Sequence, residues 1–207
     1  MHARNHEKEP KLRLLSQEQL KALLATIKNP RDLALVYVLI EGALKPAELL
    51  SLRVGNVEFR KNYCVITVKG KGGVRRLPLV ASFKPLLEWL EKHPERHNSQ
   101  APLWLAEKAK CRAVSYPYLR KIIKKAAEEA GISERVWPYL LRYTTLVSLA
   151  KCMPGWVLRC FAGLTDISHI VRHCAMIDAK DLEDIILELH GLKKRENMEN
   201  SRMSNKY

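Results

Sequence analysis

The chain has 207 residues, of which 47% are hydrophobic and 28% are charged. At roughly 150 residues per domain, this length favours one domain with appendages, and the composition is that of a globular chain rather than a disordered one. No run of 18 apolar residues is present, and the start MHARNHEKEPK lacks the apolar stretch of a secretory signal. We therefore expect neither a membrane protein nor a secreted protein, but a cytoplasmic one.

The charge balance is strongly basic, with 36 Lys and Arg against 22 Asp and Glu, a net charge of +14. Such an excess attracts polyanions, and nucleic acid is the commonest of these in the cytosol, with an acidic protein as the alternative partner. The five cysteines are scattered and odd in number, which predicts reduced, mostly packed thiols. His169 and His173 have a helical i, i+4 spacing but no evident third ligand, so we expect neither a metal nor a cofactor.

The first half of the chain predicts helices followed by a small sheet. Residues 1–14 are charged and aperiodic, which predicts a flexible lead-in. A capping box that starts at Ser16 opens a predicted helix to residue 27, and further helices are predicted over 31–41 and 46–52.

Residues 57–79 are rich in β-branched side chains and are divided by Lys61-Asn62 and by Gly70–Gly73. This pattern predicts a three-stranded antiparallel meander. Ser82 is predicted to cap the next helix, which carries an apolar stripe at Leu86 and Leu90.

The second half predicts helices only. Ser115 is the predicted cap of a helix that runs to Gly131, with an apolar face and a basic face. Further helices are predicted over 138–151, 154–162, 166–173 and 178–190, and the basic, polar tail 191–207 is predicted to be flexible. The four tryptophans are interpreted as core anchors: Trp89, Trp104, Trp137 and Trp156. The fold class predicted is mainly α with a small three-stranded antiparallel sheet, an α+β domain.

Four segments in this order resemble the catalytic domain of tyrosine recombinases, the phage-integrase and Xer-type family. They are Gly42–Leu52 (GALKPAELLSL), Val68–Leu79 (VKGKGGVRRLPL), Pro138–Thr144 (PYLLRYT) and Ala162–Ser168 (AGLTDIS). The resemblance covers about residues 15–190 and implies that family's fold. It also implies double-stranded DNA as the partner, without a membrane, and nucleoid association if the source is prokaryotic.

Members of this family cleave a DNA strand by attack of a tyrosine hydroxyl on a phosphodiester. Two arginines, a histidine, a hairpin lysine and a second histidine or tryptophan stabilise the charge and transfer protons. The resemblance places the first arginine at Lys45, the hairpin lysine at Lys71 and the histidine at Tyr139. It places the second arginine at Arg142, the second histidine or tryptophan at Leu164 and the tyrosine nucleophile at His173.

Only Lys71 and Arg142 match the family's residue types at these positions. Lys45 keeps a charge but not the planar fork of arginine, and Leu164 has no hydrogen-bonding group. Residues 144–206 contain no tyrosine, so no shift of the alignment supplies a nucleophile in place of His173. The expectation is a DNA-binding protein that has lost strand cleavage.

The resemblance also implies which residues contact DNA, because the family places the helix that matches 115–130 in the major groove. Arg75 and Arg76 flank the hairpin and would follow the phosphate backbone. The predicted DNA contacts are Lys71, Arg75, Arg76, Tyr116, Tyr118, Arg120, Lys121, Lys124, Lys125 and Arg142.

Two alternatives stay open. In the first, the chain is an active recombinase with substituted residues, in which His173 or a tyrosine attacks phosphorus. In the second, it is a modulator of an active recombinase. In the second case the acidic helix 178–190 would dock on another recombinase or on a second copy of the chain. Family members usually carry an N-terminal helical domain that closes over DNA, so either that domain was trimmed from this sequence or the chain is a half-clamp.

Overall fold

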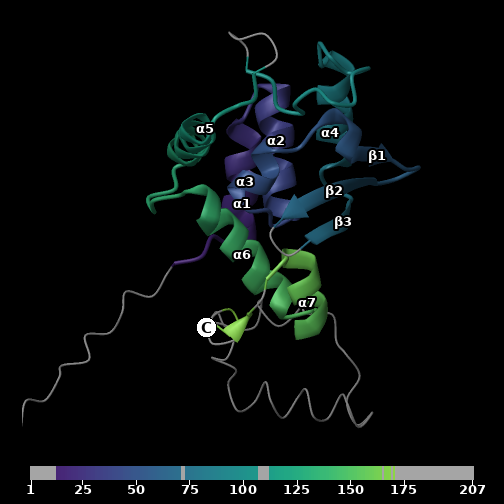
Figure 1. The fold of residues 1–207 in the computed structure, drawn as a ribbon. Helices are drawn as coiled ribbons and strands as arrows, with labels where there is room; N and C mark the ends of the chain where they lie inside the picture. Colours follow the sequence, from purple (N-terminus) through teal and green to yellow (C-terminus); the bar gives the residue numbers. More distant parts are fainter. Residues whose placement is uncertain (1–12, 71–72, 107–111, 165, 169, 171–207) are drawn as a thin grey trace, which may run out of the picture. The chain divides into compact units, whose positions relative to one another are not determined.

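The computed structural model describes residues 13–70, 73–106, 112–164, 166–168 and 170. Contacts divide the chain into residues 1–167 and 168–207, and the description below is of the first unit. Its elements are α1 (Gln17–Thr26), α2 (Pro30–Glu41), α3 (Pro46–Leu50), η1 (Val54–Asn56), β1 (Val57–Phe59), β2 (Cys64–Gly70), β3 (Gly73–Leu79), α4 (Phe83–Lys92), α5 (Tyr116–Glu129), α6 (Pro138–Ala150) and α7 (Gly155–Ala162) (Figure 1). The predicted mainly helical α+β fold class is confirmed.

Local sequence signals account for where the first helices begin. The capping box forms as expected: the Gln19 amide donates to Ser16 Oγ at 3.2 Å, and the Ser16 amide donates to Gln19 Oε1 at 2.9 Å. At the next helix, Asn29 accepts from the amides of Arg31 and Asp32. Because Pro30 has no amide hydrogen to satisfy, it is well suited to the first turn that follows.

The sheet is antiparallel in the order β1-β2-β3, as the meander pattern predicts. Cys64 pairs with Leu79 and Gly70 with Gly73, so the β2–β3 ladder extends to the hairpin turn. Alternate residues of β2 are buried, from Cys64 to Val68. One face of the sheet therefore covers the core.

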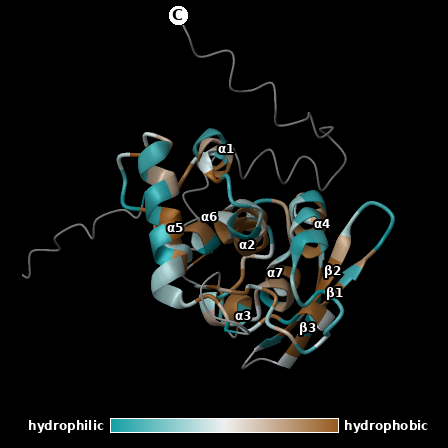
Figure 2. Cartoon of the chain, turned by 90° about the horizontal axis from the view of Figure 1, so that it is seen from above, coloured by the Kyte–Doolittle hydropathy of each residue, from teal (hydrophilic) through white to brown (hydrophobic). Residues whose placement is uncertain are grey.

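The core is organised around α2, which contacts α3, α4 and α6. Both views show α5 on one side of α2 and α4 on the other (Figure 1, Figure 2). Leu35 and Leu39 of α2 are fully buried. Trp104 is also fully buried, and its indole donates to the Leu49 carbonyl at 2.8 Å.

Three expectations about single residues are corrected. Ser82 does not cap α4 through its side chain, because its hydroxyl donates to the Glu41 carboxylate at 2.6 Å instead. Trp156 is 72% exposed rather than a core anchor, because α7 turns Leu158 and Ala162 inward and Trp156 outward. Cys152 and Cys160 are exposed rather than packed.

Some predicted segments lie wholly or partly outside the described residues. These are the lead-in to residue 12, half of the helix 166–173, the helix 178–190 and the tail 191–207. Among the helices that the structure does describe, none is long and apolar enough to cross a membrane.

Candidate nucleic-acid interface

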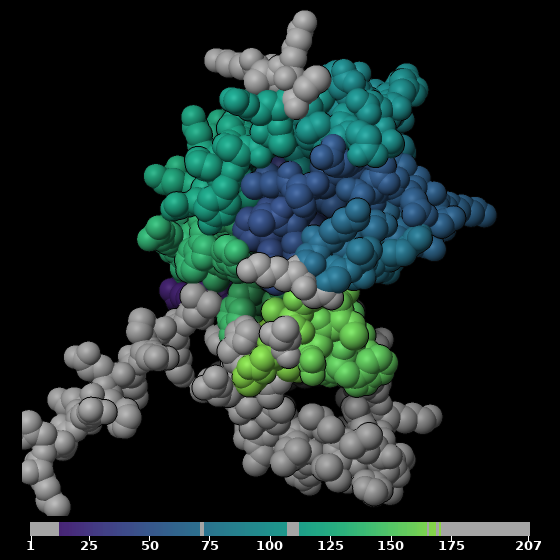
Figure 3. Space-filling model, viewed as in Figure 1, coloured from purple at the N-terminus to yellow at the C-terminus, as the bar shows by residue number. Residues whose placement is uncertain are grey.

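Helix α5 presents a basic face because its other face is anchored in the core. Leu119, Ile123, Ala126 and Ala127 are buried at helical spacing. The Ser115 hydroxyl caps the helix by accepting from the Tyr118 amide at 3.4 Å. The remaining face is exposed and carries Arg120, Lys121, Lys124 and Lys125. In the space-filling view, the teal-green residues of this region lie at the surface (Figure 3).

The four cations of this face differ in their partners. Lys124 lies 3.5 Å from Glu128 and Lys125 lies 3.6 Å from Glu129, each pair one turn apart on α5. Arg120 and Lys121, in contrast, make no hydrogen bond or ion pair to any described residue. The first half of α5 therefore carries uncompensated positive charge.

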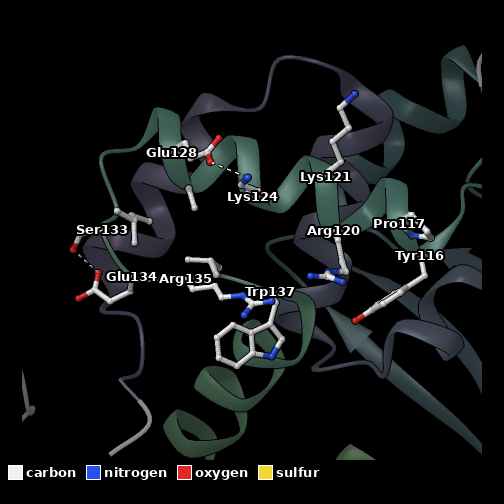
Figure 4. Close-up of a pocket in the computed structure, with 13 residues that line it drawn as sticks. Tyr116, Pro117, Arg120, Lys121, Lys124, Glu128, Ser133, Glu134, Arg135 and Trp137 are labelled. Atoms are coloured by element: carbon white, nitrogen blue, oxygen red, sulfur yellow. Dashed lines mark hydrogen bonds and ion pairs between the residues drawn. The ribbon is translucent and has the colours of Figure 1, made fainter. Parts of the chain in front are cut away.

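A hollow lies on each flank of α5. The first, of about 710 Å³, separates α5 from residues 131–137 and is lined by Arg120, Lys124 and Arg135, among others (Figure 4). The second, of about 450 Å³, separates α5 from the end of α1 and is lined by Lys28 and Lys125. Helix α5 therefore lies between two hollows, each of which is lined in part by basic side chains.

The two aromatic residues that we predicted to contact DNA lie in different surroundings. Tyr116 lines the larger hollow and Tyr118 the smaller one, and the two are 38% and 36% exposed. Tyr118 also faces α2: its hydroxyl accepts from Arg31 Nη2 at 2.7 Å and donates to Asp32 Oδ2 at 3.3 Å. Because Arg31 is buried, this contact anchors the start of α5 to α2.

A second group of cations meets at the C-terminal end of α7, where helix carbonyls lack partners of their own. Arg142, on α6 and 4% exposed, donates to the carbonyls of Ala43 and Ala162. Lys45 Nζ donates to the Gly163 carbonyl at 3.4 Å. The structure therefore brings together Lys45 and Arg142, two of the residues that we predicted at catalytic positions.

Arg75 completes this group and is held by Glu48. Its guanidinium donates to both Glu48 oxygens, at 3.0 and 2.8 Å, and its Nε donates to the Phe161 carbonyl at 3.0 Å. Arg75 is largely buried, whereas Arg76 is half exposed and pairs with Glu58 at 2.8 Å. We did not predict a role for Glu48, although its place three residues after Lys45, at the start of a helix, is a capping signal in the sequence.

Burial and charge act in opposite directions on the two ionised groups of this cluster. Burial would raise the pKa of Glu48, but hydrogen bonds from Arg75 and from the Lys45 amide, with the nearby positive charges, bring that pKa below its usual value. Burial lowers the pKa of Arg142, and the charge of Glu48 opposes that effect. Because its pKa lies below 4.5, Glu48 is ionised at neutral pH.

Two glycines allow this pair to approach the backbone. A Cβ at Gly70 would lie 2.6 Å from Glu48 Oε1, and a Cβ at Gly163 would lie 2.7 Å from Arg75 Nη1. Gly163 also has a φ of +59° at the end of α7, a conformation that favours glycine. The pair therefore joins α3, β3 and α7 at close range.

The remaining family positions are placed as follows. Tyr139 is 49% exposed on α6, one turn before Arg142. Leu164 follows α7 directly and is half-buried. Lys71 and His173 lie outside the described residues. Within the described part of the chain, no group of three or more His, Cys, Asp or Glu could hold a metal ion.

The fold is that of a tyrosine-recombinase catalytic domain. Residues 13–175 match the family model described as the phage integrase family, and the chain belongs to that family.

Among curated proteins, the chain is 30% identical to a tyrosine recombinase of Synechococcus elongatus, over 84% of this chain and 55% of the relative. It is also 30% identical to the tyrosine recombinase XerC of Erythrobacter litoralis, over 88% of this chain and 58% of the relative. The chain thus spans just over half the length of these two relatives.

Among solved structures, the XerH site-specific recombinase bound to its difH substrate superposes with a TM-score of 0.68. That match has 22% identity and covers 84% of this chain and 53% of the other, which supports a common fold.

Proposed function

We propose that this chain is a DNA-binding protein built on the tyrosine-recombinase catalytic fold, and that it engages duplex DNA with α5. The observation that carries the proposal is the uncompensated charge of Arg120 and Lys121 on the exposed face of an anchored helix. Cations on such a face can contact the phosphates that border a DNA groove. The XerH site-specific recombinase, which shares the fold, is bound to its difH substrate, and this also supports the proposal.

We propose further that the chain has lost strand cleavage. A reacting phosphodiester needs bidentate guanidinium donors, but Lys45 stands in place of one of the two arginines, and its ammonium, which lacks the planar fork, donates to the Gly163 carbonyl. Leu164, in place of the second histidine or tryptophan, has no hydrogen-bonding group. The replacement of the tyrosine by His173 is the third element of this proposal and rests on the sequence resemblance alone.

One experiment tests both parts. A nicked duplex that contains a site selected for binding from a random library is incubated with the protein, and the sample is divided between a native gel and a neutral denaturing gel. We expect a mobility shift on the native gel and no covalent protein–DNA species on the denaturing gel. A covalent species that is lost in His173→Ala would favour the active-recombinase alternative, whereas the absence of any shift would overturn DNA binding itself.

A further inference from the structure

We infer that the hollow between α5 and residues 131–137 binds a backbone phosphate of duplex DNA, and that Arg120 and Arg135 hold this phosphate between them. We call this pair the arginine clamp. The inference rests on the proposed DNA-binding function and adds to it a residue, Arg135, that lies outside the basic helix.

The chain path brings the two arginines to one hollow. Gly131, with a φ of +69°, reverses the chain after α5, and the following residues return alongside the helix to α6. Buried Ile132 and Val136 pack this segment against the core. Arg120 and Arg135 then extend into the hollow from its two walls (Figure 4).

The acidic residues of the hollow do not compensate the clamp. Glu128 lies 3.5 Å from Lys124, and Glu134 lies 3.0 Å from Arg13. Neither Arg120 nor Arg135 makes an ion pair or hydrogen bond within the described residues. Two positive groups therefore share one concave space, neither of them ion-paired with its two carboxylates, and an anion bound between them would reduce their repulsion.

The chemistry of the clamp favours a phosphodiester. Guanidinium groups match the oxygens of a phosphate with paired hydrogen bonds, and two of them from different walls can hold one phosphate from two sides. The hollow also opens along the flank of α5, next to the exposed basic face. A duplex that binds to the basic face of α5 would therefore place its phosphate backbone next to the hollow.

The test measures DNA affinity by fluorescence anisotropy from about 50 to 200 mM salt for the full chain and for Arg135→Gln. Each phosphate contact adds about 0.9 to the slope of log affinity against log salt, so we expect Arg135→Gln to lower the slope by about 0.9. The same relation gives a loss of about eightfold at 100 mM salt. Arg120→Gln should behave alike, and Arg135→Lys should keep the slope but bind more weakly, because it retains the charge without the fork.

Lys92→Gln is the matched control, because it removes an exposed charge on α4, on the other side of α2. Arg135 is exposed, so its replacement leaves the core intact, and circular dichroism checks this for each variant. If the parent chain binds DNA and Arg135→Gln has the slope of Lys92→Gln, the arginine clamp is wrong while DNA binding stands. If the parent chain does not bind DNA, the proposed function and the clamp both fail.

Discussion

Glu48 links three elements through one carboxylate. It accepts from the Lys45 amide at the start of α3 and from the Arg75 guanidinium on β3, which in turn donates to the Phe161 carbonyl of α7. Both side chains of the ion pair are largely buried, at 5% and 12% exposure. Removal of one partner from such a pair leaves the other charge uncompensated, which costs more than the pair itself contributes.

We therefore predict that Glu48→Gln lowers the free energy of unfolding by about 3 kcal/mol at pH 7. The pH dependence has a definite sign. Because the pKa of Glu48 is below its usual value of 4.5 in the folded chain, its contribution is complete above that value. The contribution is lost as the pH falls through the folded pKa. Urea unfolding at pH 7, 5, 4 and 3 measures the free energy of unfolding of the parent chain and of Glu48→Gln. A difference between these two free energies that stays constant across this pH range would contradict the prediction.

At the scale of elements, α5 shows which features can be predicted from sequence. Its bounds and its two faces followed from the Ser115 cap and from the spacing of apolar residues, and the structure confirms both. The inward contact of Tyr118 could not be predicted, because its partner Arg31 is 87 residues away in the chain. For Arg75 we predicted a contact with the phosphate backbone, and its bonds to Glu48 and Phe161 could not be predicted for the same reason, since both partners are distant in sequence.

The basic face of α5 is the element that the proposed function requires. We predict that charge reversal at two positions, Lys121→Glu and Lys124→Glu, weakens DNA binding by at least about sixtyfold at 100 mM salt, because two phosphate contacts are lost. The matched control is Lys84→Glu with Lys92→Glu on α4, which gives the same net charge. Anisotropy compares the two variants, and an equal loss in both would mean that total charge rather than α5 determines the affinity.

At the scale of the whole molecule, the order of helices and the small sheet could be predicted because each element carries local signals of periodicity and capping. The family was predicted from four short segments, and it is confirmed over residues 13–175. The candidate site was predictable only in part. Lys45 and Arg142 could be predicted as site residues from the resemblance. Their hydrogen bonds to the carbonyls at the end of α7 could not, because these bonds depend on tertiary packing.

We propose that the net charge of +14 serves contact with DNA phosphates. The most direct measurement is the affinity of the purified chain for duplex DNA from about 50 to 200 mM salt by fluorescence anisotropy. If the chain engages about six phosphates, its affinity falls by about a thousandfold over this range. An affinity that does not change with salt, or no binding at 50 mM, would contradict the account and direct attention to a protein partner.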